Sequence, residues 1–137
     1  MSIEMSFSYP TPEEYVNLRV LADMSPRDVE GAKIGLANSN HMVTCRDQGT
    51  LVGMGRIIGD QATTFQIVDV AVHPNYQGKG LGKRIMQELM KYLEKNASPN
   101  SYVSLLADGD AKYLYEKFGF KLSAPDDSLG MHLFMNE

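Results

Sequence analysis

The chain has 137 residues, a formal net charge of −4, and 43% hydrophobic and 22% charged residues. This balance is typical of a folded protein and excludes a disordered one, and we expect residues 1–137 to form a single domain. The acidic charge argues against nucleic acid as a partner, and no apolar run reaches the ~18 residues that span a membrane, so no membrane partner is expected.

Two helices are expected within the first 40 residues. Residues 11–22 (TPEEYVNLRVLA) open with Thr11 as N-cap, followed by proline and then by Glu14 three residues after the cap, which is a capping box. A second start signal, Ser-Pro-x-Asp, begins at Ser25, and that helix is expected to end near residues 38–40.

Three strands are expected next. Residues 42–47 and 50–58 are rich in β-branched and apolar side chains and flank a turn at 47–49. Residues 64–72 (TFQIVDVAV) have the length and apolar character of a long buried strand. The first half of the sheet is therefore expected to consist of hairpins.

The second half of the chain alternates strand and helix. A helix is expected over residues 81–96, a strand over 102–107 (YVSLLA), and a second helix within 110–120 that has Gly119 as its C-cap. A final short strand is expected at 130–135 (GMHLFM), paired with one at 120–122. The order strand, helix, strand predicts a βαβ crossover and a locally parallel pair.

A glycine-rich turn precedes the helix at 81–96. The stretch 73–86 reads HPNYQGKGLGKRIM, with glycines at 78, 80 and 82. First-turn amides of a helix lack intrahelical partners, and glycines let an anion approach the backbone. Three cations lie at the same end: Lys79, Lys83 and Arg84. The turn therefore indicates an anion site, with a flexible turn beside a solvated basic face as the alternative.

The spacing of these glycines excludes two nucleotide motifs. Arg84 stands where a P-loop needs Ser or Thr, and the glycines do not have the G-x-G-x-x-G spacing. The pattern Gln77-x-x-Gly80-x-Gly82 instead resembles the acyl-CoA-binding motif Q/R-x-x-G-x-G/A of the GNAT N-acetyltransferase superfamily.

The resemblance extends over residues 65–120. The strand and helix around the turn look like the fourth strand and third helix of that family, and ADGDAKYLYEKFGF is similar to its A-x-x-L-Y-x-x-x-G-F pattern. The resemblance implies an α/β GNAT acyl-CoA N-acyltransferase fold, with a mixed, mostly antiparallel sheet and helices on both faces. In that fold the fourth and fifth strands splay apart to admit the pantetheine arm of the cofactor.

The resemblance also implies cofactor contacts. The amides from Gln77 to Gly82 would hold the CoA pyrophosphate, the three cations would approach its phosphates, and the strand "VAV" would bind pantetheine. Asp108 stands where the family often has Asn, which is a departure from the pattern. The expected cofactor-binding residues are Val70, Ala71, Val72, Gln77, Gly78, Lys79, Gly80, Leu81, Gly82, Lys83, Arg84 and Asp108.

Acetyl transfer to an amine requires a neutral amine, and an alkylamine of pKa about 10.4 is neutral in roughly one molecule in a thousand at pH 7. Asp69 lies inside an apolar strand, where a carboxylate is costly unless it is paired or functional, so it is the candidate proton acceptor. The alternative is that Asp69 caps an amide or pairs with Arg56. In some family members the position of Gln66 holds a Glu that acts as the base, but the amide side chain of Gln66 cannot accept this proton.

Tyr115 is the candidate acid, because its position in the L-Y-x-x-x-G-F pattern implies that its hydroxyl faces the departing thiolate. The alternative is a core tyrosine on an apolar helix face. The first helices cover the acceptor side in this family, so several of their residues are candidates for lining the acceptor pocket or a solvated face: Tyr9, Tyr15, Glu13, Glu14, Asp28 and Glu30.

The expected activity is transfer of an acetyl group from acetyl-CoA to a primary amine of a small molecule or peptide, by direct attack in a ternary complex. The rival is a catalytically silent acyl-CoA-binding sensor or interaction module. No metal is expected, since His41, His73 and His132 lack metal-ligand spacing. The lone Cys45 and the absence of a leader pattern favour the cytoplasm. A homodimer is compatible with the family.

Overall fold

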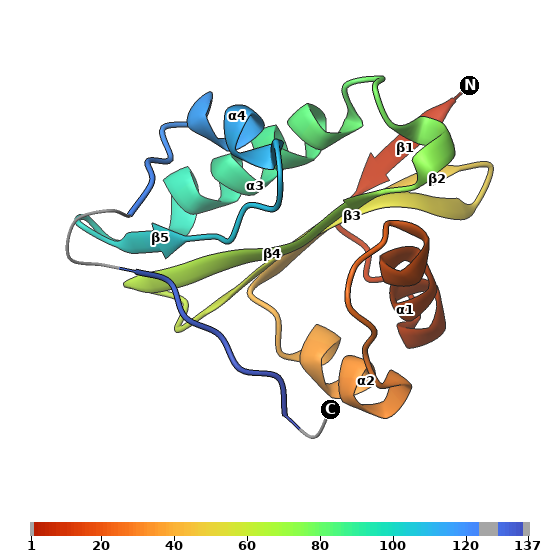
Figure 1. Ribbon diagram of the computed structural model, residues 1–137, viewed down its shortest axis with the longest axis horizontal. Coiled ribbons are helices and arrows are strands. Elements are labelled where there is room, and N and C mark those ends of the chain that lie inside the picture. Colours follow the sequence, from red (N-terminus) through yellow and green to blue (C-terminus); the bar gives the residue numbers. More distant parts are fainter. Residues whose placement is uncertain (1, 124–128, 136–137) are drawn as a thin grey trace. The chain divides into compact units, whose positions relative to one another are not determined.

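The computed structural model describes residues 2–123 and 129–135 (Figure 1). The chain divides into two compact units, one up to Leu105 and one from Leu106 onward. Among the described residues, the first unit holds the sheet, three α-helices and a short 3-10 helix, and the second holds one further α-helix.

The first unit is built on a five-stranded sheet in the order β1-β2-β3-β4-β5. The strands are β1 (Ile3–Ser6), β2 (His41–Asp47), β3 (Thr50–Gly59), β4 (Thr64–Val72) and β5 (Tyr102–Ser104). Neighbours from β1 to β4 are antiparallel, and β4 pairs with β5 in parallel. The predicted mixed, mostly antiparallel sheet and its crossover are confirmed. The edge strand β1 was not predicted.

Helices cover both faces of this sheet. α1 (Pro12–Leu21) and α2 (Val29–Ala37) lie on one face and α3 (Leu81–Asn96) on the other (Figure 1). The predicted capping box of α1 is present, with Glu14 N donating to Thr11 Oγ1 at 3.1 Å and Thr11 N donating to Glu14 Oε1 at 2.9 Å.

The predicted start of the second helix was wrong. α2 begins after Asp28, whose carboxylate accepts from Gly31 N at 2.8 Å, and not at Ser25. The reason is that Ser25 is engaged elsewhere: its carbonyl and hydroxyl oxygens both accept hydrogen bonds from Arg19.

Each face of the sheet has its own apolar core. On the α1 and α2 side the core comprises Tyr15, Leu18, Ala32, Leu36, Met42, Leu51, Met54 and Ala71. On the other face α3 buries Leu81, Ile85, Met86, Leu89 and Leu93. Gly55 of β3 permits close packing there, because a Cβ at this residue would lie 2.6 Å from Ile85 Cγ2 and 2.9 Å from Leu89 Cδ1.

The second unit contains α4 (Ala111–Glu116), which ends before the C-cap predicted at Gly119. Gly119 has φ 94°, the left-handed conformation that ends helices, and its N–H donates to Glu116 O at 3.1 Å. β5 likewise ends at Ser104, earlier than the expected 107.

The prediction of a C-terminal hairpin was wrong. Neither residues 120–122 nor residues 130–135 form a strand. The apolar side chains of this segment stay exposed, Met131 at 93% and Leu133 at 81%. Alternating polarity can assign the faces of a strand, but a strand exists only where its backbone finds a partner.

No helix in the described ranges has the length and apolar character needed to cross a membrane.

Candidate active site

The glycine-rich turn connects β4 to α3. After the short helix η1 (Pro74–Tyr76), Gly78 and Gly80 adopt left-handed φ values of 76° and 83°. Gly80 is the N-cap of α3 and, having no side chain, contributes no capping hydrogen bond. Glycine is favoured at both positions because other residues rarely adopt this conformation.

The turn presents a row of unused donors. The N–H groups of residues 78–83 donate to no backbone carbonyl within the described ranges, and the ladder of α3 begins with Arg84 N donating to Gly80 O at 3.1 Å. Successive amides at a helix N-terminus, reinforced by the helix dipole, favour an anion such as a phosphate group. The geometry of the turn therefore suits a pyrophosphate.

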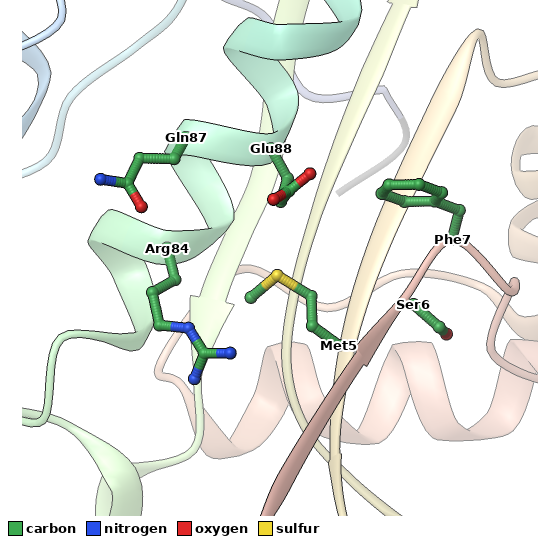
Figure 2. A pocket seen from close by; sticks show the side chains of 6 residues that line it. All are labelled: Met5, Ser6, Phe7, Arg84, Gln87 and Glu88. Carbon is green, nitrogen blue, oxygen red and sulfur yellow. The ribbon is translucent and has the colours of Figure 1, made fainter.

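The expected cations divide between two places. Lys79 Nζ lies 5.9 Å from the ring centre of Tyr76, beside the turn, and Lys83 is exposed on the first turn of α3. Arg84 instead points toward β1 (Figure 2). It lines a cavity of about 450 Å³ together with Met5, Ser6, Phe7, Gln87 and Glu88. Lys79 and Lys83 are thus better placed than Arg84 to meet an anion at the turn.

One edge of β4 is open beside the turn. β4 pairs with β5 only through Thr64, Phe65 and Gln66, while its other edge continues along β3 as far as Val72. Beyond Gln66, β4 has no strand partner on the β5 side within the described residues. The expected pantetheine-binding residues Val70, Ala71 and Val72 lie in this open stretch. Gln77 Nε2 ties the turn to the strand by donating to Val72 O at 3.0 Å.

A bulge in β4 positions Asp69. The register of β3 and β4 shifts between Met54 and Arg56, where β4 contains one residue more than β3. Asp69 lies at this shift with φ 57°, which is rare for a residue other than glycine. The bulge lets the Asp69 side chain reach the residues of α1.

Asp69 is the centre of a buried polar cluster. Its Oδ2 accepts from Tyr15 Oη at 2.9 Å and from Arg56 Nε at 2.8 Å, and its Oδ1 pairs with Arg19. The side chain of Asp69 is only 3% exposed. The ion pair with Arg56, which the sequence offered as the alternative for Asp69, is present in the structure.

Sequence reasoning missed Arg19 as a partner of Asp69. The signal was available, because Arg19 follows Tyr15 by four residues and so lies on the buried face of α1. A guanidinium on the buried face of a helix requires an anionic partner, because an unpaired buried charge is costly. Arg19 also donates to Ser25 O from both Nε, at 3.0 Å, and Nη2, at 2.9 Å, so the cluster fixes the segment between α1 and α2.

The cluster affects the chemistry of its members. Burial first, and then the Asp69 carboxylate, raise the pKa of Tyr15. This phenol therefore stays protonated and donates to Asp69 at neutral pH. Both carboxylate oxygens of Asp69 are occupied by donors from α1 and β3.

A cavity of about 340 Å³ adjoins the cluster. Its lining residues are Tyr15, Arg27, Asp28, Gly31, Ala32, Gly35, Leu36 and Arg56. Of the six acceptor-pocket candidates, Tyr15 and Asp28 line this cavity. Glu14 is instead bound to Arg46, whose hydrogen bond holds the pKa of Glu14 down at about 2, and Tyr9 donates to Ser39 O at 3.4 Å.

The remaining candidate residues, Tyr115 and Asp108, belong to the second unit. Tyr115 is the buried residue of α4, and burial, followed by the charge of Asp108, raises the pKa of its phenol. Tyr113, two residues before Tyr115, is 59% exposed. The rings of Tyr115 and Phe120 pack edge to face, with their centres 6.4 Å apart.

His41 and His73 contact neighbouring residues, and Cys45 is buried. His41 lies between the rings of Phe7 and Tyr92, and His73 Nδ1 accepts from Asn75 N at 3.0 Å. Burial raises the pKa of the Cys45 thiol to about 11, which makes it a poor nucleophile. Within the described residues no group of three or more His, Cys, Asp or Glu could hold a metal ion.

A sheet in which β4 has an open edge leads into a turn of free amides, and this is the arrangement that the resemblance to the GNAT family implied. The sequence model of the acetyltransferase (GNAT) domain matches residues 11–128. The chain therefore belongs to the GNAT acetyltransferase family, as its motifs indicated.

Known relatives agree with this assignment. The chain is 32% identical to an uncharacterized N-acetyltransferase of Porphyra purpurea, covering 94% of this chain and 78% of that protein. It is 33% identical to the N-alpha-acetyltransferase RimI of Mycobacterium tuberculosis, over 60% of this chain and 52% of RimI. A solved probable acetyltransferase of unknown function from meticillin-resistant Staphylococcus aureus shares 46% identity and a TM-score of 0.93, covering 97% and 99% of the two chains.

Proposed function

We propose that this protein transfers the acetyl group of acetyl-CoA to a primary amine, by direct attack of the amine in a ternary complex. The observation that carries the proposal is the row of free N–H groups at residues 78–83, next to the open edge of β4. The row suits the pyrophosphate of the cosubstrate, and the strand edge suits the amide groups of its pantetheine arm.

Acetyl-CoA supplies an activated acyl group as a thioester. The amine nitrogen forms a bond to the acyl carbon, and the bond from that carbon to sulfur breaks. The nitrogen gives a proton to water, and the thiolate gains one. We assign Tyr115 as the group that donates a hydrogen bond to the departing thiolate, with its proton only partly transferred at that moment. Its raised pKa keeps the phenol protonated until the sulfur becomes charged.

We assign Asp69 to the amine side of the reaction. The sequence suggested that it accepts the proton of the amine, directly or through water. Its three donors in the structure favour a positioning role instead, in which Asp69 orients Tyr15 and Arg56 at the wall of the cavity. The cavity between α1, α2 and β3 is then the place where the acceptor binds.

The test is release of free thiol from acetyl-CoA across a panel of amines, with the acetylated product confirmed by mass spectrometry. Turnover of any primary amine would support the proposal. Binding of acetyl-CoA without turnover on the panel would support the silent acyl-CoA-binding module instead. A cytoplasmic location is part of the proposal, and the free, buried Cys45 is in keeping with that reducing compartment.

A further inference from the structure

We propose that the acceptor is an amine that carries an anionic group, a carboxylate or a phosphate, and that Arg56 and Arg27 bind this group in the cavity of about 340 Å³ between α1, α2 and β3. This inference rests on the proposed function, because it names the class of acceptor. It argues against polyamines and aminoglycosides as preferred acceptors, because these amines carry several cations and no anion.

The first argument is the charge around the cavity. Arg27, Arg56 and Asp28 line it, and Asp69 and Arg19 lie directly behind Arg56 and Tyr15. These are three guanidinium groups and two carboxylates, so one positive charge is not balanced within the set. Arg27 and Asp28 are exposed, whereas Arg19, Arg56 and Asp69 are largely withdrawn from water, and these three groups hold two guanidiniums against one carboxylate. Charges withdrawn from water are costly unless they are paired, and an anion in the cavity would balance this excess.

The second argument is the geometry of Arg56. Its Nε donates to Asp69, and its Nη1 donates to Gly35 O at 3.2 Å and to Ser39 Oγ at 3.0 Å. Its Nη2 makes no hydrogen bond to any described part of the chain, although the side chain is only 15% exposed. A guanidinium that is held in place on two nitrogens and has donors left on the third is well prepared to bind an oxyanion.

The third argument is the way Arg27 is held at the same cavity. Its Nη1 donates to Ser25 Oγ at 2.9 Å and to Pro26 O at 3.0 Å. Ser25 Oγ also accepts from Arg19 Nη2 at 3.0 Å, so Arg27 is connected to the buried cluster. The one carboxylate in the lining, that of Asp28, is occupied as the N-cap of α2. The donors in the lining are therefore available, while its acidic group is already used.

The experiment compares amines that differ only in the anionic group, at constant ionic strength. The pairs are β-alanine with β-alaninamide and O-phosphoethanolamine with ethanolamine, and spermidine is the polycation. The inference expects kcat/KM to be at least about tenfold higher for one anionic member than for its neutral partner, the scale of a charge-assisted hydrogen bond. The pair that shows the difference identifies carboxylate or phosphate. Equal values within both pairs, or a preference for spermidine, would overturn it.

The variant Arg27→Gln tests the assignment of the residues. It should raise KM for the preferred anionic amine by about fivefold or more relative to its neutral partner, so that the preference for the anionic member falls. Lys33→Gln is the matched control, since it removes the same charge from an exposed site on α2 outside the cavity lining. Equal effects of the two variants would overturn the role of Arg27.

A binding measurement separates this inference from the proposed function. Calorimetric titration of the protein in the presence of CoA with β-alanine and with O-phosphoethanolamine does not depend on turnover. Binding of either compound that Arg27→Gln weakens and Lys33→Gln does not would support the anion site even if no amine is acetylated. Binding of neither compound would overturn the anion site even if neutral amines are acetylated.

Discussion

The two sides of β4 are built in different ways. Toward the glycine turn the site consists of backbone: free amides at residues 78–83 and an open strand edge. Toward α1 it consists of side chains from three elements that meet at Asp69. A backbone site is encoded by a short local motif, whereas a side-chain site depends on packing between distant segments. The variants below test this contrast, beginning with the largest expected effect.

Replacement of Asp69 by Asn should cause the largest loss of stability. The variant keeps the shape of the side chain but leaves the Arg19 and Arg56 guanidiniums without their anion, which costs about 3–5 kcal/mol for a buried pair. Chemical denaturation would measure it against Asp23→Asn, which removes an exposed carboxylate from the end of α1. A variant as stable as the wild type with much slower turnover would contradict the positioning role and favour direct proton acceptance.

Replacement of Tyr115 by Phe should cause the next largest effect, now on turnover. The change keeps the ring and removes the hydroxyl, so we expect kcat to fall roughly 10²-fold while acetyl-CoA affinity is nearly kept. The loss should shrink with a thioester whose thiol is a better leaving group. Tyr113→Phe, at an exposed position of the same helix, is the control. Wild-type turnover in Tyr115→Phe would leave a water molecule as the proton donor.

The ion pair of Glu14 with Arg46 should give the smallest effect. The folded pKa of Glu14 is lowered from 4.5 to about 2, so its contribution is fully present above pH 4.5 and is lost as the pH falls toward 2. Because the pair is partly exposed, we expect less than about 1 kcal/mol. The difference in unfolding free energy between wild type and Glu14→Gln should therefore shrink over this range. A difference in unfolding free energy that stays constant over this pH range would contradict the lowered pKa of Glu14.

Local signals explain what the sequence predicted. The capping box of α1, the strand over 64–72 and the glycine turn each depend on neighbouring residues, and the structure contains all three. The four-residue β1 was missed because its sequence, IEMS, has little β-propensity, and its pairing with β2 spans some forty residues.

The acceptor side could not be predicted to the same extent. Asp69 stood out as a carboxylate in an apolar strand, and its pairing with Arg56 was foreseen as an alternative. Arg19 lies 50 residues away from Asp69, and the bulge that joins them leaves no mark in the residue pattern. The cavity beside them is formed by the packing of α1 and α2 on the sheet, which sequence spacing does not show.

The central claim is that the amides at the start of α3 hold the pyrophosphate of acetyl-CoA, and calorimetry of acetyl-CoA binding tests it most directly. Gly82→Val places a branched side chain among the free amides, whereas the control Gln87→Val places one on an exposed part of the same helix. Circular dichroism would confirm that both variants are folded. The account predicts at least about tenfold weaker binding for Gly82→Val and little change for Gln87→Val. Unchanged affinity in a folded Gly82→Val variant would contradict it.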